Sequence, residues 1–297
     1  MKTPEISNGY NIGILQHINV SNITGLSAYL VWPVLLGLNT GLFVALFRYG
    51  VNVGLALTLS IFSIVFTMIV TERWLTYRND WQPTVKEWWV NLFYFMVNGA
   101  VSNLGAIIAA MLVVSLSPAT TEMSLMIAVP VAILVSELAG YWWHRIGHES
   151  TFVWRFHAIH HLPKKINIAN NNTVHFVDLF TSSLLGAIPA LLLGLPAEAI
   201  AIAMFYSSFQ SFFAHINAKV KLGWLGYIVM GPEHHRYHHS VEVDEALNYS
   251  VSIAIWDQIF GTFLYRPYSQ PEQIGIKDDN NYPDSTQILK TMIKPFH

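Results

Sequence analysis

The stretch ELAGYWWHRIGHESTFVWRFHAIHH, residues 137–161, joins the end of a long apolar segment to two clusters of histidines. Trp142 and Trp143 close the apolar part, and His144 and His148 follow at a spacing of four residues. Residues four apart lie on one face of a helix, a single turn from each other. We therefore expect this helix to continue beyond the apolar environment and to present both imidazoles on the same face.

The second cluster in that stretch repeats the spacing, because His157 and His161 are also four residues apart and His160 stands beside them. A third cluster follows in PEHHRYHHS, residues 232–240, where the pattern H-x-x-H-H occurs again. A lone histidine such as His17 needs no explanation beyond a solvated surface or a satisfied core position. Crowded imidazoles do need one. Protonated rings repel one another, neutral rings gain little from crowding, and a shared metal relieves both problems.

The three clusters offer more ligands than one metal ion takes, since a structural zinc ion binds about four. The chain contains no cysteine, so histidine and carboxylate must supply any metal ligands. Imidazole suits iron, copper, zinc and nickel alike, and the ligand type therefore does not choose the metal. We expect two metal ions with open coordination positions, held by His144, His148, His157, His160, His161, His235, His238 and His239.

The composition indicates a membrane protein. Hydrophobic residues make up 53% of the chain and charged residues 11%, whereas a soluble domain carries about 25% charged residues. A spanning helix needs roughly 20 apolar residues, and no secretory signal is expected at the N-terminus. The net charge of -2 gives no argument for nucleic-acid binding. Spans are predicted at residues 26–47, 51–70, 88–116 and 123–143.

Lysines and arginines orient these predicted spans. The loop before the third span carries Arg73, Arg78 and Lys86, whereas SPATTE, residues 117–122, carries no basic residue. Further basic residues follow the fourth span. The positive-inside rule then places both termini and all three histidine clusters in the cytoplasm, at a bacterial inner membrane or the endoplasmic reticulum. Arg48 lies on the opposite side and does not outweigh the other residues.

A further apolar region at residues 176–213 is broken by GLPAE, residues 194–198. It predicts either two more crossings or a re-entrant or interfacial helical pair. The expected fold is an all-α, multi-pass transmembrane bundle with a cytoplasmic, helical, histidine-rich cap for two metals. The expected organisation is an N-terminal cytoplasmic segment at 1–25, transmembrane helices at 26–143, a catalytic region at 144–266, and a polar C-terminal tail with little core at 267–297.

The order and orientation of the histidine motifs resemble those of the fatty acid hydroxylase/sterol desaturase superfamily of integral-membrane di-iron oxygenases. The resemblance covers residues 137–263, including H-R-x-x-H, W-R-x-H-x-x-H-H and the closing NYSVSIAIWDQIFGTF at residues 248–263. It implies that the eight motif histidines bind two iron ions. It also implies a ninth ligand at His215, because FFAHINA stands where members often have another ligand histidine. The N-terminal spans match only in hydropathy.

Five further residues are candidates for contact with the metals, directly or through a ligand. Glu137 lies seven residues before His144, two helical turns back on the same face, and an ionisable group inside a membrane is a functional candidate. Metal-bound histidines usually donate their second N–H to a carboxylate or carbonyl. His175 stands where many members of the resembled family have H-P-x-E, although phenylalanine replaces the proline and Asp178 the glutamate. The five candidates are Glu137, Asp178, Asp257, His175 and His234.

The resemblance implies an oxidoreductase that uses O2 and external electrons to hydroxylate or desaturate an unactivated C–H bond of a lipid. Sterols, fatty acyl chains, sphingolipids and ether lipids all stay open as substrates. No flavin or nicotinamide fingerprint occurs in the sequence, so we expect electrons from a cytochrome b5-like protein or a ferredoxin and its reductase.

Two alternatives belong to other classes. A histidine-rich metal transporter predicts polar residues spread along several spans, but the first two spans carry little beyond Asn39, Asn52 and Thr58. A non-catalytic lipid-binding scaffold predicts lost ligand positions, and none of the eight is lost.

Overall fold

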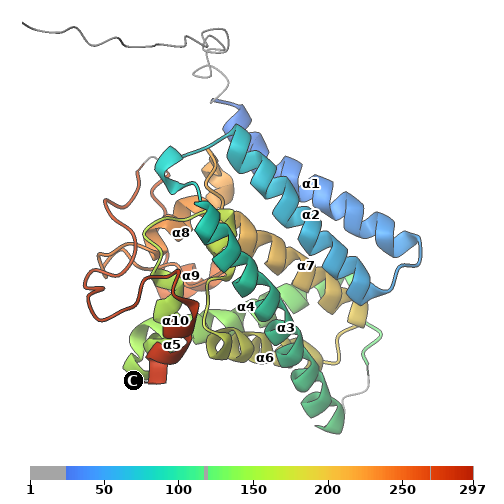
Figure 1. Cartoon of the computed structure of the whole chain (residues 1–297). Coiled ribbons are helices and arrows are strands. Elements are labelled where there is room, and N and C mark those ends of the chain that lie inside the picture. Colours follow the sequence, from blue (N-terminus) through green and yellow to red (C-terminus); the bar gives the residue numbers. More distant parts are fainter. Residues whose placement is uncertain (1–24, 117–119, 268, 297) are drawn as a thin grey trace, which may run out of the picture.

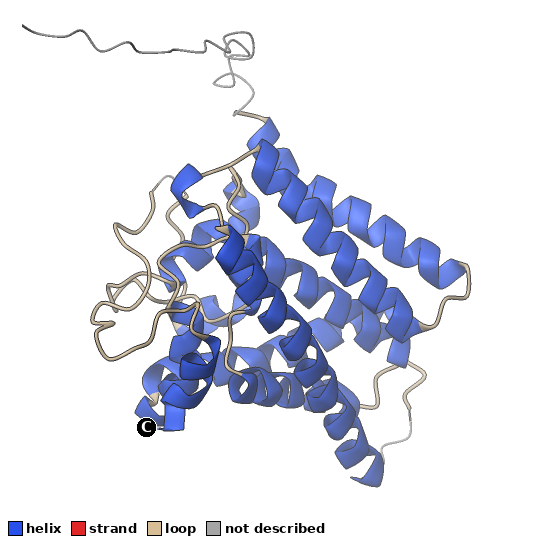
Figure 2. Cartoon of the chain, viewed as in Figure 1, coloured by secondary structure: helices blue, strands red, loops and turns tan. Residues whose placement is uncertain are grey.

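The computed structural model describes residues 25–116, 120–267 and 269–296, and every regular element within these ranges is a helix (Figure 2). The all-α expectation is therefore confirmed. The N-terminal segment expected at residues 1–25 lies, except for Gly25, outside the described residues.

Four helices are long and apolar enough to cross a membrane, and their bounds agree with the predicted spans to within a few residues except at the end of α4. Only 22% of each spanning window is buried, so the outer faces of these helices are apolar surfaces that suit a lipid solvent. The chain is an integral membrane protein. The spanning helices are α1 (Ser27–Arg48), α2 (Val53–Trp74), α3 (Val85–Leu116) and α4 (Leu125–Glu149).

The second half of the chain supplies shorter helices that fill and cap the bundle (Figure 1). The helix α6 packs on α3 and α4, and α7 packs on α2 and α4. The α-helices are α5 (Thr151–His161), α6 (Phe176–Leu192), α7 (Ala197–Ala214), α8 (Pro232–His238), α9 (Ile255–Phe260) and α10 (Ile288–Ile293). The 3-10 helices are η1 (Asn79–Trp81), η2 (Ile168–Asn172), η3 (Gly223–Tyr227) and η4 (Lys294–Phe296).

The turn between α6 and α7 lies at the end of the bundle that is remote from the histidines. The backbone N–H of Thr121, in the loop between α3 and α4, donates a 2.8 Å hydrogen bond to the carbonyl of Gly194 in that turn. Figure 1 shows the α1–α2 and α3–α4 loops at this end, whereas α8, α9 and α10 lie at the other. The pair α6 and α7 therefore runs from one end of the spanning helices to the other and back.

Buried polar groups tie the spans together and to the cap. The side chain of Asn39 in α1 donates to Thr67 Oγ1 in α2 at 3.1 Å. Such hydrogen bonds between spanning helices contribute about 0.6 kcal/mol each on average. Near the C-terminal end of α2, Glu72 Oε1 accepts hydrogen bonds from the backbone N–H groups of Ile168 at 2.7 Å and Asn217 at 2.6 Å. Glu72 thereby fixes two loops beside the histidine clusters.

The C-terminal tail differs from the expectation of a polar extension with little core. It returns over the histidine-bearing half, where the N–H of Gly275 donates to the carbonyl of His239 at 2.9 Å. Thr291, which is fully buried, lies 2.6 Å from the hydroxyl of Tyr94 on α3. The tail is held by backbone groups and a few buried side chains, so its polar composition did not reveal this docking.

Candidate metal centre

Nine buried or half-buried histidines gather into two adjacent groups at one end of the bundle. Within each group, every residue offers a ligand atom, and those atoms all lie within 4.8 Å of one another. The rings of His161 and His239, one from each group, stack with their centroids 4.3 Å apart. We call the sets the first histidine group (His144, His148, His157, His161 and His238) and the second histidine group (His160, His215, His235 and His239).

The helical spacing of the motifs decides which group each histidine joins. In each of the three motifs, the two residues four apart stay together, as His157 and His161 do in the first group. The additional residue of each H-x-x-H-H motif joins the other group: His160 goes to the second and His238 to the first. Each H-x-x-H-H motif therefore connects the two groups, and the groups are held at a fixed separation by helix geometry.

Local chain geometry brings α5 back against the end of α4. Ser150 lies between the two helices in an extended conformation, and its hydroxyl accepts a hydrogen bond from the N–H of Val153 at 3.4 Å. At Gly147 an added Cβ atom would lie 3.2 Å from Cγ of His157. The absence of a side chain at this position lets the second motif approach the first.

Hydrogen bonds at Nδ1 fix the tautomers of two histidines in the first group. His144 donates from Nδ1 to the carbonyl of Tyr249 at 2.7 Å, and His238 donates from Nδ1 to the carbonyl of Leu247 at 3.0 Å. A neutral ring has one donor nitrogen and one acceptor nitrogen, so each Nε2 carries a lone pair. These Nε2 atoms face each other at 2.9 Å. Two lone pairs at that distance repel unless a cation lies near both.

Other rings of the two groups also have an acceptor oxygen beside Nδ1. Asp178 Oδ2 lies 2.8 Å from Nδ1 of His157, and Asp178 Oδ1 accepts a 2.7 Å hydrogen bond from the indole N–H of Trp143. His160 has its Nδ1 3.4 Å from the carbonyl of Thr173. Nε2 of His148 is buried and has no hydrogen-bond partner among the described residues. In the first group, therefore, unprotonated nitrogens point into a shared space, and in the second group the Nε2 atoms of His160 and His239 lie 3.2 Å apart.

Burial keeps these rings neutral. Loss of solvation, reinforced by the neighbouring imidazoles, lowers the pKa of His161, His238 and His239 well below the ordinary value. Burial also lowers the pKa of His215 to about 3. Neutral imidazole is the form that binds a metal, so protons compete little with a metal at physiological pH. The all-nitrogen donor set and the facing lone pairs fit transition-metal ions, iron among them.

Two of the three candidate carboxylates support the metal centre through a neighbour, and the third does not reach it. Asp178 contacts His157 directly, as described above. Asp257 accepts from the N–H groups of Tyr249 at 2.8 Å and Ser250 at 2.9 Å, and so holds the carbonyl that His144 uses. Glu137 contacts none of the described histidines: its carboxylate accepts from the N–H groups of residues 251 and 252 and from the hydroxyl of residue 252.

Two candidate histidines lie outside both groups. His175 caps α6, where its Nδ1 accepts from the N–H of Val177 at 3.1 Å and its Nε2 donates to the carbonyl of Met292 at 3.0 Å. His234 donates from Nε2 to the carbonyl of Gly226 at 2.9 Å and stacks on a tyrosine ring. Both are buried histidines with structural hydrogen bonds.

Sequence reasoning missed the backbone acceptors and the tryptophan that orient the rings. The carbonyls of Leu247 and Tyr249 flank Asn248, whose φ of 66° is the left-handed conformation that asparagine tolerates better than most residues. The side chain of Asn248 also donates to the carbonyl of Leu264 at 2.9 Å. The asparagine that opens the closing motif was the available signal for a sharp bend that turns two carbonyls toward the histidines.

Comparisons with known proteins agree with this geometry. The family model described as fatty acid hydroxylase matches residues 129–262. Ornithine lipid hydroxylase OlsE of Rhizobium tropici is 29% identical over 262 residues, which cover 83% of this chain and 78% of that protein. Human alkylglycerol monooxygenase is 31% identical over 135 residues, which cover 44% of this chain and 29% of that protein. The fatty acid hydroxylase vlmA of a Lecanicillium species is 27% identical, covering 44% and 40% respectively.

No solved structure matches the chain. The match to the alkylglycerol monooxygenases is confined to less than a third of their length, whereas the bacterial hydroxylase is matched over most of its length. The matched region contains all nine histidines of both groups. The histidine-bearing region of this membrane protein thus belongs to the fatty acid hydroxylase family, an oxidoreductase family whose matched relatives are lipid hydroxylases and monooxygenases.

Proposed function

We propose that this protein hydroxylates a polar membrane lipid and that its nine grouped histidines bind two iron ions, one in each group. The observation that carries the assignment is the pair of Nε2 atoms on His144 and His238, which face each other at 2.9 Å while both Nδ1 atoms donate elsewhere. In the overall reaction one oxygen atom of O2 enters a C–H bond and the other leaves as water, with electrons and protons from a donor.

Iron bound in these groups would supply the activation of O2 that the protein's own side chains cannot provide. The chain's residues hold the ligand nitrogens unprotonated and in fixed orientations. Asp178 and the carbonyls of Leu247 and Tyr249 bind the outer nitrogen of a ring and prevent its rotation. Burial of both groups keeps bulk water from a reactive centre, which limits side reactions.

The substrate class is inferred from the relatives. OlsE, matched over most of its length, is named as an ornithine lipid hydroxylase, and the other relatives are named as a monooxygenase and a hydroxylase. These names favour hydroxylation over desaturation, and they favour a lipid with a polar headgroup. Access from the membrane is supported by the position of both groups at the end of the spanning helices.

We place the active site on the cytoplasmic side, because the basic residues concentrate in the loops at that end. Arg78, Arg145 and Lys165 all lie at the histidine-bearing end of the spans. A soluble one-electron donor of the cytochrome b5 or ferredoxin type could reach that face. The sequence contains no flavin or nicotinamide fingerprint that would supply electrons within these residues.

Iron content and lipid products test this proposal together. Full-length protein purified from iron-supplemented cells should contain two iron ions per chain, one for each histidine group. With O2 and a reductant, polar lipids should gain one oxygen atom, as measured by mass spectrometry. One iron or none in protein that keeps its fold would contradict the metal assignment, and absence of any oxygenated lipid from the iron-loaded protein would contradict the reaction.

A further inference from the structure

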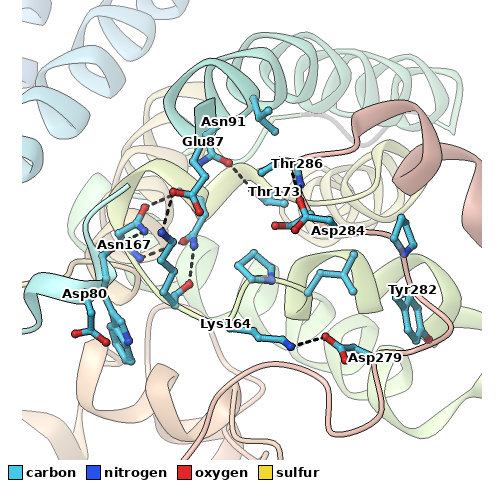
Figure 3. Close-up of a pocket in the computed structure, with 18 of the residues that line it drawn as sticks. Asp80, Glu87, Asn91, Lys164, Asn167, Thr173, Asp279, Tyr282, Asp284 and Thr286 are labelled. Carbon is cyan, nitrogen blue, oxygen red and sulfur yellow. Dashed lines mark hydrogen bonds and ion pairs between the residues drawn. The ribbon is translucent and has the colours of Figure 1, made fainter. Parts of the chain in front are cut away.

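A polar cavity of about 530 Å³ lies beside the metal centre. Its walls are the start of α3, the segment that follows His161, and residues 279–286 of the C-terminal tail (Figure 3). Leu162, in the wall, follows His161 of the first histidine group. Thr173, also in the wall, has its carbonyl 3.4 Å from Nδ1 of His160 in the second. An occupant would contact the segments that carry both groups.

The cavity lies at the start of a membrane-spanning helix, where we expect a lipid headgroup to meet the hydrocarbon. It is lined by Glu87 and Val90, in the first two turns of the spanning helix α3. Trp89 is 69% exposed, as expected for an aromatic residue at a membrane interface. One and two turns deeper, Phe93 and Val97 follow Val90 at helical spacing and are 44% and 38% exposed. An acyl chain could therefore run down α3 from the cavity.

The charges in the lining favour a cationic guest. Lys165 pairs with Glu87 at 2.8 Å, and Lys164 pairs with Asp279 at 2.7 Å. Within the described residues the carboxylate of Asp284 has no ion pair. It accepts hydrogen bonds from the N–H and hydroxyl of residue 286, which lower its pKa and keep it ionised. The fourth carboxylate in the lining, Asp80, pairs with Arg78 at 2.6 Å, so Asp284 leaves the described lining with one unpaired negative charge.

A second observation points to an oxygen-bearing guest. Asn91 lines the cavity and is only 7% exposed. Its Oδ1 accepts a 2.8 Å hydrogen bond from the hydroxyl of Thr173, while its Nδ2 has no hydrogen-bond partner among the described residues. This N–H group stays accessible in the cavity wall and can donate to a guest. A carboxylate, carbonyl or phosphate oxygen of a ligand would satisfy it.

We propose that this cavity binds the zwitterionic headgroup of an aminolipid, with the amine beside Asp284 and an oxygen on Nδ2 of Asn91. The proposal rests on the proposed function and names the substrate class for it. The acyl chain lies along Phe93 and Val97, so a lipid is favoured over the free amine that shares its headgroup chemistry.

Equilibrium binding to the full-length protein in phosphatidylglycerol nanodiscs, which contain no amine, tests the site. The probes are N-dodecanoyl ornithine, the same molecule with its side-chain amine acetylated, and free ornithine. We expect the free-amine lipid to bind about fivefold more tightly than the acetylated one, as one partly exposed ion pair allows. Asp284→Asn should abolish this ratio, whereas Asp278→Asn, an exposed carboxylate outside the cavity, should preserve it.

A second variant separates the two ends of the headgroup. Asn91→Leu removes the Nδ2 donor at similar size and adds no charge, so it should weaken both lipids alike. Equal binding of the two lipids to the unaltered protein, or an unchanged ratio in Asp284→Asn, would overturn the headgroup site. Saturable binding of free ornithine as tight as that of the lipid would overturn the choice of a lipid. Binding is measured without turnover, so a protein that discriminates the lipids but oxygenates none would refute the proposed reaction and leave the site standing.

Discussion

At the scale of single residues, the hydrogen bond at Nδ1 decides which ring nitrogen is left unprotonated and able to bind a metal. Residue type and spacing predicted eight of the nine histidines that the structure brings together, because an H-x-x-x-H spacing on a helix leaves little freedom in where two rings point. The ninth, His215, was predicted only by the family resemblance. Spacing could not separate His234 or His175 from them. Those two rings differ from the rest only in the carbonyl groups that their Nε2 atoms meet, which depend on tertiary structure.

Substitution of one grouped histidine and of one histidine outside the groups should separate metal ligands from histidines with a structural role. His238→Ala and His234→Ala both remove a fully buried ring from α8. We expect His238→Ala to lose at least half of the bound iron and all lipid oxygenation, because a ligand of the first histidine group is gone. His234→Ala should keep its iron. Metal analysis of both purified variants checks this, and full iron content in His238→Ala would exclude the ligand role.

The carboxylate beside His157 allows a prediction about a residue that binds no metal itself. Asp178→Asn leaves one oxygen where Asp178 now accepts from both a histidine and a tryptophan. Loss of such a ligand-orienting partner lowers metal affinity by about 10- to 100-fold. Competition with a metal chelator measures the effect. Asp244→Asn, at an exposed position, is the control, and equal chelator sensitivity in the two variants would contradict the orienting role of Asp178.

At the scale of helices, the decisive feature is that α5 folds back on α4 at Gly147. A Cβ atom added at Gly147 would lie 3.2 Å from Cγ of His157, which is closer than nine in ten contacts that Cβ atoms make in real proteins. Inside a helix, however, alanine is favoured over glycine by about 1 kcal/mol. Gly147→Ala should therefore lower iron affinity several-fold without lowering thermal stability in the metal-free state. A variant that loses stability and affinity together would show that position 147 serves folding alone.

The bounds of the apolar helices were well predicted, because hydropathy decides them. The hydrogen-bond partners of buried side chains were poorly predicted, because they depend on distant parts of the chain. Four spans and the break between α6 and α7 follow from the length of apolar runs. Glu137 illustrates the limit. Its helical position was predicted, but its carboxylate binds backbone N–H groups of residues 251 and 252 instead of a histidine. No local pattern tells which distant loop a buried carboxylate will hold.

The whole molecule is organised so that the nine grouped histidines lie at one end of the spanning helices. Glu72 ties α2 to the loops that precede and follow α6 and α7, and Thr121 binds Gly194 at the opposite end. With 17 residues, α6 is about 25 Å long at 1.5 Å per residue, close to the roughly 30 Å of hydrocarbon. We propose that a pair reaching both ends in this way crosses the membrane twice, a choice between crossing and re-entrant helices that hydropathy alone did not decide.

Thiol labelling in intact cells tests this arrangement, and the chain is suited to it because it contains no native cysteine. Lys86→Cys, Glu122→Cys and Glu198→Cys each place one thiol at an exposed position, at the start of α3, in the α3–α4 loop and at the start of α7. A membrane-impermeant maleimide should label positions 122 and 198 from outside and should reach position 86 only after lysis. Labelling of position 198 only after lysis would mean that α6 and α7 do not cross. Labelling of position 86 in intact cells would place the histidine groups on the outer face.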